Sequence, residues 1–161
     1  MQATLDARRI RLTAPPSHSS EGTPPVLLDG VVIGRARRST SRLVFGYGRY
    51  IVKVGHQSRN EVEVWDGLPD VDRPYFAAPV AWGTVEGDVE RRWWVAQRVL
   101  PIKRALQCYS LAEWQTAWEE LYPVLLRNDI RDVLFDEVIG MPRPHNWTIV
   151  DDAPVVFDYA S

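Results

Sequence analysis

The spacing of hydrophobic residues along the chain changes near residue 100, from a strand-like pattern to a helical one. Before that point, short runs rich in β-branched and aromatic side chains alternate with polar stretches that contain glycine or proline, a pattern typical of strands. Gly46-Tyr47-Gly48 is a turn signal between two of these runs and predicts an antiparallel hairpin. The five predicted strands lie at residues 31–33, 43–45, 50–54, 77–85 and 93–99.

One short helix is predicted among these strands and a longer one after them. Asn60 is a candidate N-cap for the short helix, which Gly67 ends. Ser110 and Glu113 form a capping box before the long helix, in which Pro123 predicts a kink or a break. Its apolar positions recur at helical spacing and predict a core-facing stripe that consists of Leu111, Trp114, Trp118, Leu121 and Leu125.

The two ends of the chain differ from this pattern. Residues 1–25 mix arginine, serine and proline, so we expect a flexible arm outside the core, either solvated or binding phosphate or a partner. Apolar runs at 147–150 and 154–157 flank Asp151 and Asp152 and predict a closing hairpin. The expected division is an arm at 1–25, a strand-rich part at 26–100, and a helical part with this hairpin at 101–161.

Composition narrows the class of protein. The 161 residues are 45% hydrophobic and 25% charged, which is typical of one soluble globular domain. Cys108 is the single cysteine, which excludes an internal disulfide, and no secretory signal pattern opens the chain, so we expect a cytoplasmic protein. The apolar runs are far shorter than the roughly 20 residues that span a bilayer. The net charge of −2 argues against nucleic acid as a partner.

Several polar features stand in an order that suits a nucleoside triphosphate with Mg²⁺. Gly34 opens a polar loop between two predicted strands, and Lys53, one of two lysines, lies on the next strand before a helix with carboxylates. Asn146 and Asp158 flank the last hairpin. Loop amides can cover phosphates, an ammonium braced by a carboxylate can pair with phosphate oxygens, and hard oxygen ligands suit Mg²⁺.

In these motifs the chain resembles a reduced protein-kinase-like protein, of the kind found among small bacterial and phage kinases and relatives of aminoglycoside phosphotransferases. The resemblance covers residues 26–160. It implies an α+β fold with a five-stranded antiparallel N-lobe and one helix, a truncated helical C-lobe, and ATP with Mg²⁺ in a cleft between the lobes. The segments that carry it are 33–45, 50–54, 60–65, 95–101, 145–149 and 155–160.

The resemblance also implies roles for individual residues. Lys53 is the phosphate-pairing lysine, and Glu61 is its helix partner, with Glu63 as the other candidate. The backbone of Gln97 to Val99 is the hinge that meets adenine. The implied phosphate-loop and metal-binding positions are Gly34, Asn146 and Asp158.

One departure from the family pattern bears on catalysis. Met141 stands where the family has the Asp that orients the substrate hydroxyl, and a thioether cannot do that work. Asp136 and His145 are substitutes only in a rearranged loop. Because such a group contributes about 10²- to 10⁴-fold, its loss predicts an impaired enzyme.

The sequence therefore leaves three functional hypotheses. The first is a pseudokinase that binds ATP with Mg²⁺ and acts on a protein partner from the phage or the bacterial host. The second is an active small phosphotransferase whose acceptor is itself, another protein or a small molecule. The third is a protein-interaction module that binds no nucleotide.

Overall fold

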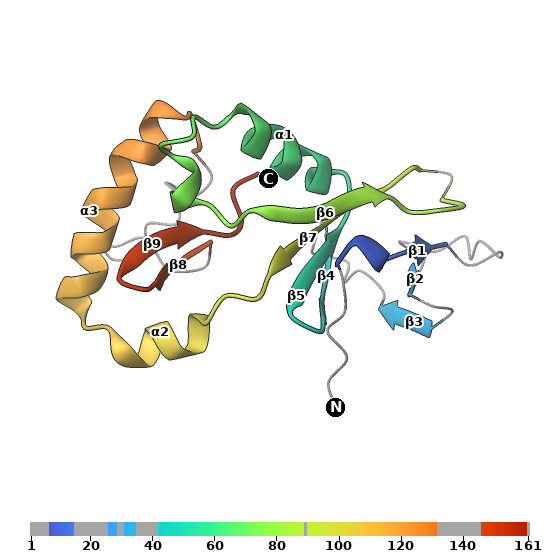
Figure 1. Cartoon of the computed structure of the whole chain (residues 1–161), viewed down its shortest axis with the longest axis horizontal. Helices are drawn as coiled ribbons and strands as arrows, with labels where there is room; N and C mark the ends of the chain where they lie inside the picture. Colours follow the sequence, from blue (N-terminus) through green and yellow to red (C-terminus); the bar gives the residue numbers. More distant parts are fainter. Residues whose placement is uncertain are drawn as a thin grey trace. The chain divides into compact units, whose positions relative to one another are not determined.

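The computed structural model describes residues 7–14, 26–28, 31–34, 42–88, 90–131 and 146–160. The chain forms two compact units: unit 1 comprises Met1–Val62 and Pro79–Val99, and unit 2 comprises Glu63–Ala78 and Leu100–Ser161. Helices and antiparallel sheets both occur, so the fold is α+β as predicted (Figure 1). Within the described ranges no helix is long and apolar enough to cross a lipid bilayer.

Unit 1 contains a four-stranded antiparallel sheet in the order β4-β5-β7-β6. In its register, Lys53 on β5 lies opposite Val44 on β4 and opposite Val95 on β7. Gly48 has a φ of 59° in the turn between β4 and β5, which confirms the predicted hairpin. The strands are β4 (Leu43–Tyr47), β5 (Tyr50–Val54), β6 (Pro79–Thr84) and β7 (Trp93–Arg98).

The predicted five-stranded sheet is wrong. Strand β3 (Val31–Gly34) pairs with β2 (Val26–Leu28), which pairs with β1 (Leu12–Thr13), and these three form a separate sheet. Only the dipeptide Asp29-Gly30, a strong hairpin sequence, separates β2 from β3. Closing this short connection costs less entropy than pairing β3 with β4 across the eight residues between them.

Part of the predicted N-terminal arm belongs to the core of unit 1. The 3₁₀ turn η1 (Ala7–Arg9) precedes β1, and Ile10 and Leu12 are 3% and 1% exposed. Both pack in one cluster with Val52 and Trp94 of the four-stranded sheet. The expectation of an arm over residues 1–25 therefore fails for 7–14, because alternate apolar residues between exposed arginines are enough to bury one face of an extended segment.

Helix α1 (Gln57–Gly67) begins three residues before Asn60, so this asparagine is not its N-cap. Instead, the Ser58 hydroxyl donates to the main-chain oxygen of Lys53 at 3.0 Å and is fully buried. This bond ties the first turn of α1 to the end of β5. The helix ends at Gly67, as the sequence predicts.

The described residues of unit 2 include helical segments and a hairpin. The capping box at the start of α3 is confirmed, since Ser110 Oγ accepts from the Glu113 N–H and Glu113 Oε2 accepts from the Ser110 N–H. Helix α3 continues through the exposed Pro123 without ending, because residues on both sides of it pack in the core. The elements are η2 (Arg73–Tyr75), α2 (Ile102–Cys108), α3 (Leu111–Arg127), β8 (Trp147–Val150) and β9 (Ala153–Val156).

The closing hairpin lies beside α3 (Figure 1). Tryptophan side chains of the two elements pack together in the core of unit 2. The rings of Trp114 and Trp147 meet edge to face with centroids 5.0 Å apart, and Trp118 lies 5.8 Å from Trp147. The central residues of the hairpin turn, Asp151 and Asp152, have φ values of 50° and 64°. Two consecutive positive φ angles are typical of the tight two-residue turn that joins the strands of a β-hairpin.

Residues 63–78 belong to unit 2, although the sequence analysis grouped them with the strand-rich part. Phe76 forms a parallel bridge with Val156 of β9, and the Ala77 N–H donates to the Val156 carbonyl at 2.7 Å. The Tyr159 hydroxyl closes the same region by donating to the Ala77 carbonyl at 3.1 Å. These contacts join segments about 80 residues apart in the sequence, which local patterns do not predict.

Candidate functional site

Unit 1 holds a buried ion pair between strand β5 and the first turns of helix α1. Lys53 Nζ lies 2.7 Å from Glu61 Oε1, and the two residues are 5% and 0% exposed. Lys53 stands between Val52 and Val54, which face the hydrophobic cluster of unit 1, so strand alternation directs the lysine to the opposite face of the sheet. Glu61 stands on the second turn of α1 and meets it there.

The structure thus distinguishes between the two carboxylates that the sequence left as alternatives. Glu61 is the partner of Lys53, whereas Glu63 is exposed two residues further along the same helix. Residues two positions apart on a helix point about 200° apart around its axis, so only one of Glu61 and Glu63 can face the sheet.

Arg42 joins the pair and was not identified by the sequence analysis. Its Nη1 lies 2.8 Å from the same oxygen, Glu61 Oε1, and Arg42 is 9% exposed. The signal was present in the strand register: Arg42 precedes Val44 by two residues, and Val44 lies opposite Lys53. Residues that differ by two positions share a face, so Arg42 and Lys53 are diagonal neighbours.

The Arg42–Glu61–Lys53 cluster places two cationic side chains on one buried carboxylate. Burial raises the pKa of the Glu61 carboxyl, and the charges of Lys53 and Arg42 offset part of that rise. One carboxylate oxygen therefore receives two cationic donors, while Glu61 Oε2 has no hydrogen-bond partner within the described part of the chain. Guanidinium and ammonium groups are donor types that suit phosphate oxygens.

The predicted phosphate loop and hinge are described in part. Gly34 ends β3 and pairs with Val26, and the arginine-rich stretch that follows it lies outside the described residues. Gln97 is buried on β7 opposite Ile51. Val99 is 51% exposed, but its N–H donates to the Arg49 carbonyl at 2.9 Å. That donor is not available to adenine while this bond persists.

Asn146 and Asp158 come together at the open end of the β8–β9 hairpin in unit 2. The Asn146 carbonyl accepts the N–H groups of Phe157 and Asp158, at 2.9 and 3.2 Å. Both residues are partly exposed. The pair offers an amide and a carboxylate oxygen, which are ligand types that Mg²⁺ accepts. The described ranges contain no group of three or more His, Cys, Asp or Glu side chains that could hold a metal ion.

The three positions invoked for catalysis are not described. Asp136, Met141 and His145 all fall in the stretch 132–145, outside the described residues. That Met141 takes the place of the aspartate expected in a kinase-like protein therefore stays a prediction.

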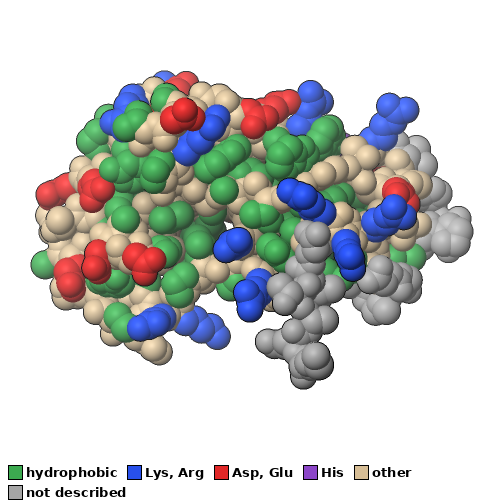
Figure 2. Space-filling model, in the orientation of Figure 1, with side chains coloured by type: hydrophobic (Ala, Val, Ile, Leu, Met, Phe, Trp, Pro, Cys, Tyr) green, Lys and Arg blue, Asp and Glu red, His purple; other side chains and the backbone are tan. Residues whose placement is uncertain are grey.

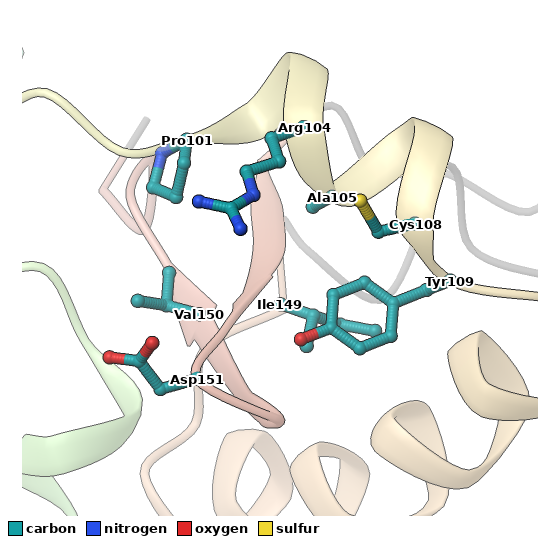
Figure 3. A pocket seen from close by; sticks show the side chains of 8 residues that line it. All are labelled: Pro101, Arg104, Ala105, Cys108, Tyr109, Ile149, Val150 and Asp151. Carbon is teal, nitrogen blue, oxygen red and sulfur yellow. The ribbon is translucent and has the colours of Figure 1, made fainter.

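A hollow of about 200 Å³ lies in unit 2 beside α2 and the hairpin turn. Figure 3 shows Arg104 and Cys108 on α2, Tyr109 after it, and Asp151 on the turn around this hollow. The Tyr109 hydroxyl donates to Asp152 Oδ1 at 2.8 Å, and this hydrogen bond raises the pKa of Tyr109. The same hydroxyl accepts the Asp152 N–H at 3.3 Å, so Tyr109 supports the turn.

Unit 2 also leaves several large hydrophobic side chains exposed. Figure 2 shows hydrophobic patches in green, interrupted by acidic groups in red, over the region of α3 and the hairpin. Single exposed hydrophobic residues are ordinary on a protein surface and identify no particular partner. The exposed residues of unit 2 are Val71, Leu106, Leu111, Tyr122 and Leu126. The prediction that Leu111 lies in the core-facing stripe of the long helix is therefore wrong, since Leu111 is the first residue of α3 and is 67% exposed.

Comparisons with known proteins add no family to this geometry. No protein-family model matches the chain, and neither a curated protein nor a solved structure was found to match it.

Proposed function

We propose that the protein is kinase-like, binds a nucleoside triphosphate with Mg²⁺, and transfers phosphate poorly or not at all. The observation that carries this proposal is the buried ion pair between Lys53 and Glu61, at 2.7 Å. A lysine on the face of a sheet, braced by a helix carboxylate, is the arrangement that positions an ammonium group for phosphate oxygens.

The burial of this pair is what favours a functional role over a purely structural one. Removing a lysine and a glutamate from water is costly, and a buried ion pair often stabilises a fold no more than hydrophobic residues of similar volume. A buried ion-pair cluster on a sheet face is therefore weak evidence of a stabilising role, and its lysine and arginine are residue types that bind anionic ligands. Lys53 is also one of only two lysines in a chain rich in arginine.

Asn146 and Asp158 are the residues proposed to hold Mg²⁺. Their main chains are joined at the end of the hairpin, so the two side chains start from neighbouring positions. Mg²⁺ is commonly bound through one or two protein oxygens together with phosphate oxygens and water. Two protein ligands are thus sufficient if the nucleotide supplies the others, and binding should then depend on the metal.

The same proposal predicts slow chemistry. Met141 cannot accept or orient a hydroxyl proton, so the chain lacks the group that the kinase-like pattern places before the metal-binding Asn146. A nucleotide-binding protein of this kind would act through a protein partner.

Nucleotide binding tests the proposal directly. The affinity for ATP, with and without Mg²⁺, is measured by calorimetry for the native chain, for Lys53→Met and for Asp158→Ala. Lys103→Met is the matched control, because Lys103 is exposed on α2 in unit 2. We expect Mg²⁺-dependent binding by the native chain and by the control, and at least 10-fold weaker binding by the other two variants.

Thermal unfolding provides a second readout. ATP with Mg²⁺ at 100 times its dissociation constant stabilises the folded state by about 2.7 kcal/mol, which raises the melting temperature of a chain of this size by about 5 to 10 °C. The absence of both a temperature shift and calorimetric binding would reject the proposal and favour a protein-interaction module. Transfer of labelled γ-phosphate to any acceptor would instead favour an active phosphotransferase.

A further inference from the structure

The hollow beside α2 is lined by one cationic and one anionic side chain that the proposed function does not use. Arg104 belongs to α2, and Asp151 belongs to the turn between β8 and β9. Figure 3 shows Arg104 extending from the helix over the hollow and Asp151 on the hairpin side of it. The residues that line the hollow belong to unit 2, so its geometry is set within one compact unit.

Within the described ranges, the charges of Arg104 and Asp151 pair neither with each other nor with a third side chain, since neither side chain forms a hydrogen bond or an ion pair there. Both residues are exposed, so a solute can reach them. A guanidinium binds a carboxylate through a planar fork of N–H donors, and a carboxylate accepts hydrogen bonds from an ammonium group. The two residues together therefore complement a molecule that carries both charges.

The geometry of the turn does not account for the carboxylate of Asp151. Its φ of 50° is a conformation that glycine adopts without steric cost. The next residue, Asp152, has a structural task, because its Oδ1 accepts a hydrogen bond from the Tyr109 hydroxyl at 2.8 Å. The side chain of Asp151 has no comparable contact among the described residues, so its charge remains available to a ligand.

The size and the lining of the hollow limit the ligand further. Its volume of about 200 Å³ is below the roughly 300 to 1,000 Å³ of pockets that hold drug-sized molecules, so the ligand is small. Part of the wall is apolar: Ala105 and Ile149 are both 3% exposed, and Pro101 and Val150 lie beside them. A short aliphatic group that packs against this wall leaves water, which favours binding.

We propose that this hollow binds a small zwitterion with an aliphatic group, which is the chemical class of the free aliphatic amino acids. Arg104 binds the carboxylate of the ligand, Asp151 binds its ammonium group, and the aliphatic group packs against Ala105 and Ile149. The proposal uses none of the residues assigned to the nucleotide or to Mg²⁺, so the two proposals can fail separately.

Nuclear magnetic resonance titrations of the full chain test this proposal with L-leucine, isocaproate, isoamylamine and glycine. Isocaproate is leucine without the ammonium group, isoamylamine is leucine without the carboxylate, and glycine lacks the aliphatic group. Shifts of the backbone amides of the hairpin turn report binding at the hollow and give the dissociation constants.

The variants are Arg104→Gln and Asp151→Asn. Asparagine tolerates a positive φ, so the turn is expected to persist, and melting temperatures check that both variants fold. Lys103→Gln is the matched control, because Lys103 is exposed on the same helix and does not line the hollow.

We expect Arg104→Gln to weaken the binding of leucine and isocaproate by about 5- to 10-fold and to leave isoamylamine binding unchanged. Asp151→Asn should weaken leucine and isoamylamine binding by about the same factor and leave isocaproate binding unchanged. Lys103→Gln should bind every probe like the native chain, and glycine should bind more weakly than leucine.

Three results would overturn the proposal. The first is a native chain whose hairpin amides do not shift with leucine. The second is an equal loss for all probes in both variants, because the effect of the substitutions would then be structural. The third is glycine binding as tightly as leucine, which would remove the role of the apolar wall.

Discussion

Arg127 Nε donates to both carboxylate oxygens of Asp72, at 3.1 and 2.9 Å. Arg127 Nη2 contacts the same carboxylate, and Asn128 Nδ2 adds a hydrogen bond of 2.7 Å. Asp72 is fully buried in the turn before η2, 55 residues from the end of α3 where Arg127 stands. The contact therefore joins two distant segments of unit 2 around one charged group.

This contact predicts an acid-sensitive contribution to stability. Hydrogen bonds from Arg127 and Asn128 hold the pKa of Asp72 below its ordinary value of 3.8, against the opposing effect of burial. A carboxyl whose pKa is lowered by folding stabilises the protein at pH values above its ordinary pKa. This stability is lost as the pH falls through the lower pKa of the folded state. We expect Asp72→Asn to melt below the native chain at pH 7 and the difference to narrow below pH 3.8. Melting temperatures at a series of pH values check this, and a difference independent of pH would contradict it.

The Arg42–Glu61–Lys53 cluster predicts a large effect of Glu61 on stability. Glu61→Gln removes the carboxylate charge that both buried cations contact, and removing one partner of a buried ion pair costs about 3 to 5 kcal/mol. The control is Glu63→Gln, an exposed position of the same helix, which should change stability by less than about 0.5 kcal/mol. Denaturant unfolding measures both, and similar losses in the two variants would reject the assignment of Glu61.

The N-terminal segment provides a test of the corrected fold. Leu12 is 1% exposed and pairs with Leu28, so Leu12→Ala should destabilise unit 1 by about 2 to 5 kcal/mol. Arg11→Ala, at the exposed neighbouring position, should change stability by less than about 0.5 kcal/mol. If Leu12→Ala unfolds at the same denaturant concentration as the native chain, residues 7–14 are an arm as the composition suggested.

The hairpin turn of unit 2 offers a stabilising substitution. Asp151 has a φ of 50°, a conformation that glycine adopts without steric cost, so Asp151→Gly should stabilise unit 2 by about 0.5 to 1 kcal/mol. Asp152→Gly relieves similar strain but loses the hydrogen bond from Tyr109, so its gain should be smaller. Denaturant midpoints for the two variants make the comparison. A larger gain for Asp152→Gly would show that the Tyr109 contact does not support the turn.

Features that depend on neighbours in the sequence were predictable. The Ser110–Glu113 capping box, the β4–β5 hairpin and the closing hairpin all follow from residues within a few positions of each other. The approach of Lys53 to Glu61 belongs to this class as well, because only eight residues separate the end of a strand from the second turn of the next helix. Their role in binding a nucleotide remains a proposal.

The sequence by itself determined the α+β character and most strands and helices, and it named Lys53 and the alternatives Glu61 and Glu63 as candidate residues. Only the tertiary structure decided that β3 pairs with β2, that Ile10 and Leu12 enter a core, and that Arg42 shares the carboxylate of Glu61. It also decided that the Val99 N–H is engaged by the Arg49 carbonyl. The physical reason is that a strand can pair with many other strands and an apolar residue can be buried against many surfaces. Which partner is chosen depends on loop entropy and on burial summed over the whole unit.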